Sequence, residues 1–175
     1  MKGKILQAGA PVLRQKAKPV LKKDFGSPAL RKTIEKMRKA MADYGEYGVA
    51  IAAPQIGASL RVFIVSAKAF RYMDKDSGQD QGEGAYQDMV FVNPELVRLS
   101  RKKNPEHEGC MSVHGTFGVV MRHEKASVKA HDESGKPFLY HGSGLLAHIF
   151  QHEVDHLEGI LFIDKAESLN EEKIG

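Results

Sequence analysis

Apolar residues recur at helical spacing in two parts of the chain. In the first part they lie three or four positions apart, at Leu30, Ile34, Met37 and Met41. Ser27 followed by Pro28 is typical of a helix start, because the serine oxygen can cap free amide groups and proline fits the first turn. Gly45 is a suitable C-terminal stop. We therefore predict a helix between Pro28 and Gly45.

The second periodic segment begins at Gly142 and is apolar almost all round the helix axis. Its apolar residues are Leu145, Leu146, Ile149, Phe150, Val154 and Leu157. A helix with apolar residues on every side must be buried. We expect Ser143 to be its N-cap and Gly159 to end it. Ile160–Ile163 is expected to follow as a buried strand or extended segment.

Short runs rich in β-branched and aromatic residues fill the middle of the chain. The predicted strands are Arg61–Ser66, Met89–Val92, Val97–Leu99, Val119–Met121, Ala126–Ala130 and Phe138–Tyr140. The polar stretch Asp74–Gln87 is expected to be a surface loop. The order helix, strands, helix predicts an α+β fold, with small mixed or antiparallel β-sheets packed around the second helix. Since no linker or repeat is visible, residues 1–175 are predicted to form a single domain.

Composition narrows the class of protein without identifying it. The chain has 175 residues, of which 42% are hydrophobic and 27% charged, as in an ordinary globular domain. No apolar run approaches the roughly 18 to 20 residues of a membrane helix, and the N-terminus lacks the apolar core of a signal peptide. We therefore expect a cytoplasmic protein with no membrane partner. The single cysteine excludes an internal disulfide bond and makes its thiol a candidate for chemistry.

Basic residues are concentrated at the N-terminal end of the chain. The first forty residues hold 12 Lys and Arg against Asp24 and Glu35 only. Such a segment can attract RNA or another polyanion through counterion release. No aromatic residues interleave with the charges as a base-stacking surface requires, so solvated lysines on a surface helix are the favoured interpretation. No feature indicates specific DNA binding.

The second predicted helix carries the pattern HEVDH, with His152, Glu153 and His156. Side chains four positions apart leave the same face of a helix, so the two imidazoles can bind one metal ion. Glu153 lies beside them as a base. The alternative is a pair of hydrogen-bonded core histidines with a surface acid.

The third ligand decides the class of metal site. Zinc endopeptidases with the pattern HExxHxxGxxH need a histidine six residues after the second one, and Phe162 occupies that position here. The remaining candidate is Cys110 in the segment EGCMS, where Gly109 permits close backbone approach. A lone cysteine is often only a small buried residue, but the His pair needs a partner. Three protein ligands with an open fourth position for water are typical of a catalytic metal.

Attack of water on a carbonyl carbon leaves negative charge on oxygen, which requires hydrogen-bond donors. The loop Gly48–Gly57, with the sequence GVAIAAPQIG, has small residues whose backbone can lie against an extended peptide. Its Gln55 offers a side-chain amide, and the backbone amide of Met111 is a second candidate donor. By itself such a loop is equally compatible with tight packing between a helix and a strand.

The segments GVAIAAPQ, EGCMS and QHEVDHLEG follow one another in this order along the chain. With them the sequence resembles peptide deformylase, from Ile5 and Leu6 through to Leu161–Asp164. The resemblance implies a metal-dependent hydrolase that removes the formyl group from the N-terminal formylmethionine of newly made polypeptides. It also implies one divalent ion, usually Fe(II). A mixed thiolate and imidazole set accepts Zn, Ni or Co as well.

The resemblance further implies a role for each matching residue. Cys110, His152 and His156 would be the metal ligands, and Glu153 the general acid and base. Gln55 and the Met111 amide would hold the formyl oxygen. The implied substrate contacts are Gly48, Val49, Ala50, Ile51, Gly109, Leu145, His148 and Ile149. Gly48–Ile51 would pair with the peptide as an added strand, and Val49, Leu145, His148 and Ile149 would line the methionine pocket.

Two positions near the expected site give further hypotheses. Ala50 stands where the family usually has glycine, so the loop would be strained if this position has a positive φ. Arg122 is hypothesised to pair with an acid near the metal, either Glu108 or Asp155. The implied partners are N-formylmethionyl nascent peptides, with a transient contact to the ribosome for which the basic N-terminal residues could serve.

Three other functions fit parts of the sequence. The first is a metal-dependent amidohydrolase or aminopeptidase that acts on another small N-acyl or peptide substrate. The second is a metal-free binding or redox protein with Cys110 as a reactive thiol. The third is an RNA-binding module built on the basic N-terminus.

Overall fold

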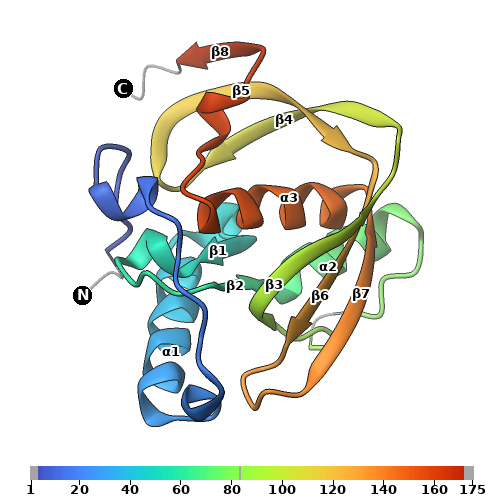
Figure 1. Ribbon diagram of the computed structural model, residues 1–175. Coiled ribbons are helices and arrows are strands. Elements are labelled where there is room, and N and C mark those ends of the chain that lie inside the picture. Colours follow the sequence, from blue (N-terminus) through green and yellow to red (C-terminus); the bar gives the residue numbers. More distant parts are fainter. Residues whose placement is uncertain (1–3, 83, 172–175) are drawn as a thin grey trace.

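Helix α3 (Leu145–Leu157) runs through the middle of the molecule, with strands on either side of it (Figure 1). The computed structural model describes residues 4–82 and 84–171. The other α-helices are α1 (Pro28–Asp43) and α2 (Ala67–Asp76). The strands are β1 (Ala50–Ala52), β2 (Val62–Val65), β3 (Met89–Leu99), β4 (Lys103–Cys110), β5 (Val113–His123), β6 (Lys125–His131), β7 (Pro137–Ser143) and β8 (Ser168–Glu171). Short 3-10 helices include Gly45–Tyr47, Ala53–Ile56 and Phe162–Asp164.

The described strands form two antiparallel sheets. A five-stranded sheet has the order β1-β2-β3-β6-β7, and a three-stranded sheet has the order β4-β5-β8. In Figure 1 the β4–β5 pair arches over one side of α3, while β1, β2, β3, β6 and β7 lie on its other side. The predicted α+β fold with small sheets around the second helix is therefore confirmed.

The core between α3 and the five-stranded sheet is aromatic and aliphatic. Phe63 and Phe91 stack with ring centroids 4.5 Å apart, and Phe150 from α3 packs against both rings. Burial of such rings contributes about 1.5–3 kcal/mol per side chain. On the opposite side of α3, Val113 and Val120 of the three-stranded sheet form a smaller cluster with Leu161 and Phe162, which follow α3, and the Phe162 ring stacks on His152 of α3. Helix α3 is thus held from both sides.

Both predicted helices exist, with one difference at a terminus. Ser27 Oγ accepts a hydrogen bond from the Leu30 amide at 3.2 Å and caps α1 as expected. The predicted cap Ser143 is wrong, because Ser143 ends β7 and Gly144, with φ 55°, precedes α3. Gly159 does follow the end of α3, with φ 76°. Within the described residues, no helix combines the length and apolar character needed to cross a bilayer.

Three other elements differ from the sequence predictions. The predicted strands Met89–Val92 and Val97–Leu99 are parts of the single strand β3, which passes through Asn93 at φ 50°. Part of the predicted loop Asp74–Gln87 belongs to α2, and residue 83 of that loop lies outside the described residues. In place of a strand at Ile160–Ile163, an extended Leu161 leads into a 3-10 helix.

Candidate metal centre

The three predicted ligands converge on one point. The sulfur of Cys110 and one ring nitrogen from each of His152 and His156 all lie within 4.8 Å of one another. Cys110 Sγ is 3.3 Å from His156 Nε2. These are the spacings that three ligands of one ion require. The structure therefore brings together residues that are distant in sequence.

Local structure explains this convergence. His152 and His156 lie one turn apart on α3, and their ring centroids are 5.0 Å apart. Cys110 is the last residue of β4, where the β4–β5 register shifts between Gly109 and Cys110. Because β4 and β5 cover α3, the end of β4 reaches the histidine face of the helix. Two rigid elements thus position the three donors.

The chemistry of the donors fits a bound divalent ion. Burial alone would raise the pKa of Cys110, but the charges and hydrogen bonds of His156 and His152 outweigh it and lower the pKa to about 5. The sulfur is therefore a thiolate near neutral pH, which is the form that binds metal. His152 Nδ1 donates to Glu108 Oε2 at 2.7 Å, which leaves Nε2 as its ligand atom. A sulfur and two imidazole nitrogens suit a borderline-soft metal.

Glu108 supports the ligands from a fully buried position. Its carboxylate accepts hydrogen bonds from His152, from His148 Nε2 at 3.0 Å, and from Arg122 Nε at 2.5 Å and Nη2 at 3.1 Å. Burial would raise the pKa of Glu108, but these donors outweigh burial and hold it far below its usual range. Arg122 also donates to Asp155 at 2.7 Å. The hypothesis that Arg122 pairs with an acid near the site is confirmed, and it pairs with both candidates.

Glu153 is buried beside the ligands without a hydrogen-bond partner for one oxygen. Glu153 is 4% exposed, and its Oε2 has no hydrogen-bond partner among the described residues. Burial raises the pKa of this carboxyl, while the charges of His152 and His156 act in the opposite direction. A carboxylate with a raised pKa and a free oxygen is suited to accept a proton and return it.

Two candidate donors lie on the same side of the centre. Gln55 Oε1 accepts from the Ala52 amide at 2.8 Å, which turns Nε2 toward Ser112 Oγ at 3.1 Å and Cys110 Sγ at 3.6 Å. The Met111 amide follows Cys110 directly and has no acceptor in the described part of the chain. Both donors can therefore face an oxygen bound next to the sulfur.

The predicted substrate contacts lie in and just before β1 and on α3, except Gly109, which lies on β4. Strand β1 is an edge strand, and Ala50 within it has no positive φ, so the expected strain at Ala50 is absent. Val49, Leu145 and Ile149 belong to one apolar cluster. A strand at the edge of a sheet, next to an apolar cluster, is suited to pair with an extended peptide that carries one apolar side chain.

Two predicted contacts have other neighbours in the structure. His148 donates to Glu108, and its Nδ1 lies 3.7 Å from Glu106 Oε2. A Cβ at Gly109 would come within 2.8 Å of the Phe117 ring, so this glycine makes room for Phe117. Both residues therefore have structural roles that the sequence pattern did not indicate.

Some residues around the centre were missed from the sequence. Glu108 was considered only as a partner of Arg122, although its place two residues before Cys110 puts both side chains on one face of β4. Ser112 is fully buried against Gln55. Gln7 and Tyr44 both donate to the Met111 carbonyl. No sequence signal links these two residues to Cys110, because they act through a backbone group.

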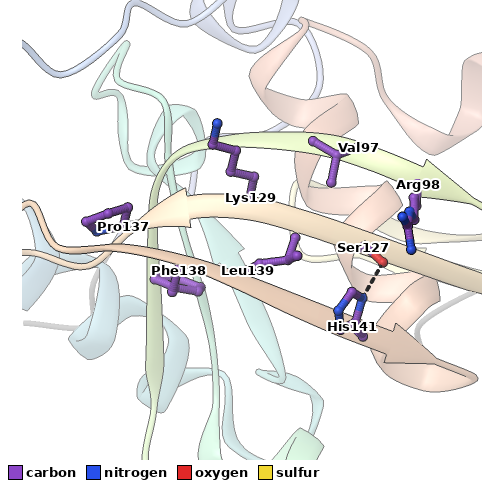
Figure 2. Close-up of a pocket in the computed structure, with 8 residues that line it drawn as sticks. All are labelled: Val97, Arg98, Ser127, Lys129, Pro137, Phe138, Leu139 and His141. Carbon is purple, nitrogen blue, oxygen red and sulfur yellow. Dashed lines mark hydrogen bonds between the residues drawn. The ribbon is translucent and has the colours of Figure 1, made fainter.

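The cavity in Figure 2 lies elsewhere, on β3, β6 and β7. It has a volume of about 550 Å³ and contains a Ser127–His141 hydrogen bond of 2.7 Å. Its lining residues are Val97, Arg98, Ser127, Lys129, Pro137, Phe138, Leu139 and His141. None of the predicted site residues lines it, so its shape does not bear on the metal centre.

Comparison with known proteins gives matches over nearly the whole chain. A family model described as "Polypeptide deformylase" matches residues 2–172. A protein named "Peptide deformylase" from Halothermothrix orenii is 41% identical over 170 residues, which is 97% of this chain and 97% of the relative. The crystal structure of a peptide deformylase from Legionella pneumophila has a TM-score of 0.77 at 40% identity, covering 94% of this chain and 85% of that one. A Met-Ala-Ser-bound class I type b peptide deformylase from Acinetobacter baumannii has a TM-score of 0.78 at 33% identity, covering 92% and 97%.

Proposed function

Because the chain belongs to the peptide deformylase family, we propose that its catalytic metal is held by Cys110, His152 and His156. Enzymes of this family are metal-dependent and remove the N-formyl group from nascent peptides, and this chain is such a hydrolase. The observation that carries the proposed ligand set is the convergence of the thiolate and two imidazoles within 4.8 Å. We further propose that residues 1–175 act as one catalytic domain.

In the proposed mechanism, the residues around the metal have different roles in formamide hydrolysis. A bound metal ion supplies Lewis acidity and lowers the pKa of water. Glu153 takes a proton from the attacking water at its free Oε2 and passes a proton to the leaving amine nitrogen as the C–N bond breaks. Gln55 Nε2 and the Met111 amide donate to the formyl oxygen as negative charge develops on it. Formate and the free N-terminal amine are the products.

We propose that the peptide binds as an extra strand along the β1 edge, at Gly48–Ile51. The methionine side chain would then contact the apolar cluster of Val49, Leu145 and Ile149, with His148 at its border. Gly109 lies beside the ligand Cys110 and would allow the substrate backbone to approach. We further propose that the acyl group occupies a space next to the metal that admits a formyl hydrogen but not a methyl group.

The small acyl space predicts selectivity for formyl over acetyl substrates. We expect formyl-Met-Ala-Ser to be hydrolysed about 10- to 200-fold faster, in kcat/KM, than acetyl-Met-Ala-Ser, since one extra carbon costs about 1–3 kcal/mol in a fitted pocket. Formate and acetate release from the two peptides at equal enzyme concentration measure this ratio. Equal rates, or release of N-acylmethionine by cleavage of the Met–Ala bond, would instead support the alternative amidohydrolase or peptidase function.

We propose Fe(II) as the native ion, with Zn, Ni and Co as ions that the same donors accept. Protein purified without oxygen is then expected to contain one iron per chain and to lose activity in air, because Fe(II) and the Cys110 thiolate both oxidise. Metal analysis and formate release before and after exposure to air test this. Activity that is stable in air in freshly isolated protein would contradict Fe(II) and favour another metal.

We also propose a transient contact with the ribosome through the first forty residues, which would place the enzyme in the cytoplasm with its nascent substrates. Twelve Lys and Arg against two acids support this proposal. If about six of them contact RNA phosphates, affinity for ribosomes should fall about 10³-fold between 50 and 200 mM salt. Co-sedimentation at several salt concentrations measures the slope. Binding that does not depend on salt would rule out this contact.

A further inference from the structure

We propose that Gln7 is a positioning residue of the metal centre, which fixes the peptide group whose N–H donates to the sulfur of Cys110. The inference rests on the proposed role of Cys110 as a metal ligand. It concerns a part of the chain far from the metal-binding motifs, because Gln7 and Met111 are 104 positions apart.

The Gln7 side chain spans the turn that joins β4 to β5. Its Nε2 donates to the Met111 carbonyl at 2.9 Å, and its Oε1 accepts from the His114 amide at 3.2 Å. Both functions of the side-chain amide are therefore used on the same turn. A residue of different shape or charge cannot satisfy the two contacts together.

The backbone on either side of Gln7 is anchored as well. The Leu6 amide donates to the Gln55 carbonyl at 2.8 Å, and the Ala8 amide donates to the Ser112 carbonyl at 2.7 Å. The N-terminal segment thus crosses both loops that supply the proposed oxyanion donors. The backbone hydrogen bonds of Leu6 and Ala8 therefore fix the position from which the Gln7 side chain extends to the turn.

The Met111–Ser112 peptide group is fixed at both of its polar ends. The Met111 carbonyl accepts a second hydrogen bond, from Tyr44 Oη at 3.3 Å, and the Ser112 amide donates to Cys110 Sγ at 3.4 Å. Because a peptide group is planar and trans, fixing its C=O direction also fixes its N–H direction. Gln7 and Tyr44 therefore aim this N–H at the sulfur.

An N–H donor on a thiolate withdraws negative charge from the sulfur. Such contacts from outside the ligand set tune how strongly a ligand binds its metal, and losing them typically costs about 10- to 100-fold in affinity or activity. The Met111 amide belongs to the preceding peptide group, and we expect the contacts that fix its neighbour to restrict its direction as well. We expect Gln7 to act on the rate of the chemical step more than on peptide binding.

The test compares Gln7→Ala and Gln7→Glu with wild type in the cobalt-substituted holoenzyme. Gln7→Glu keeps an acceptor for the His114 amide but cannot donate to the Met111 carbonyl. Gln15→Ala is the matched control, because Gln15 is an exposed glutamine for which no side-chain hydrogen bond is found within the described residues. The measurements are the sulfur-to-cobalt charge-transfer band, the cobalt dissociation constant by chelator competition, kcat, KM and Tm.

Both Gln7 variants are expected to shift the charge-transfer band and to weaken cobalt binding about 10-fold. Their kcat should fall about 10-fold while KM stays within about 2-fold, the lower end of effects from such contacts. Gln15→Ala should match wild type. Tyr44→Phe, which removes only the longer hydrogen bond to the same carbonyl, should give a smaller shift in the same direction and serves if a Gln7 variant does not fold.

An unshifted band with unchanged kcat per bound cobalt would overturn the proposal, even if Tm falls, because that result indicates a purely structural role. Wild-type values in Gln7→Glu would overturn it as well. The band and the cobalt affinity do not depend on which amide is hydrolysed. Absence of formate release by the wild type would therefore count against the proposed function and leave the inference about Gln7 separately testable.

Discussion

Glu153→Gln is expected to lower kcat for formate release by roughly 10²- to 10⁴-fold, the range for a positioned acid–base group. Glutamine retains the size of the side chain but cannot take a proton from water or give one to the leaving amine. Cys110, His152 and His156 are unchanged, so one metal ion per chain should remain. Single-turnover formate release and metal analysis of the same preparation test the two parts together.

A second measurement separates the catalytic effect of this variant from a folding defect. Glu153 is buried with an unpartnered oxygen, and a buried carboxylate without full hydrogen bonding destabilises the fold. We therefore expect Tm of metal-free Glu153→Gln to equal or exceed that of metal-free wild type. Glu167→Gln, at an exposed acid outside the site, is the control and should keep wild-type kcat. Wild-type kcat in Glu153→Gln would refute the proposed acid–base role.

Arg122→Met is expected to lower the free energy of unfolding by about 3–5 kcal/mol, the cost of breaking a buried ion pair by removing one partner. Methionine replaces the side-chain volume but leaves Glu108, whose side chain is fully buried, without its cation. Asp155 loses the same cation but keeps Lys165 at 2.8 Å. Urea unfolding of the metal-free protein measures the change.

Lys102→Met provides the matched control for Arg122→Met. Lys102 pairs with Glu124 at 3.1 Å but is two-thirds exposed, and surface pairs of this kind contribute about 0–1 kcal/mol. The double variant Glu108→Gln with Arg122→Met should recover part of the lost stability, because it removes the uncompensated charge. A loss for Arg122→Met no larger than that for Lys102→Met would show that the buried network does not hold the site.

Two helices, α1 and α3, could be predicted from the sequence because their buried apolar residues recur at helical spacing. Helices α1 and α3 bury most of their apolar positions, so spacing alone located them. Strand β3 was divided in two because Asn93 and Pro94 are typical of a turn. In the structure the Asn93 side chain instead bonds to both backbone groups of Val20, a distant contact that no local pattern shows. Strand β4 was missed because its buried side chain is the charged Glu108.

The proposed metal ligands could be predicted from the sequence, whereas the residues that orient them could not. His152 and His156 are close in sequence, and Cys110 is the single cysteine, so few combinations had to be considered. Gln7 and Tyr44 donate to the backbone carbonyl of Met111. Every residue type has this carbonyl, so the sequence does not show which residues bind it. Sequence patterns therefore identified three side chains that the structure brings together, and the structure was needed to find what orients them.

Cys110 lies on β4 and the two imidazoles lie on α3, so the proposed ion would cross-link two parts of the fold. Cys110 and His156 are 46 positions apart, and the small sheet that carries Cys110 is joined to α3 by the Glu108–His152 and Arg122–Asp155 hydrogen bonds. Part of the free energy of ion binding is consequently folding energy for this sheet. Removal of the proposed ion is therefore expected to lower the stability of the β4-β5-β8 sheet as well as the activity.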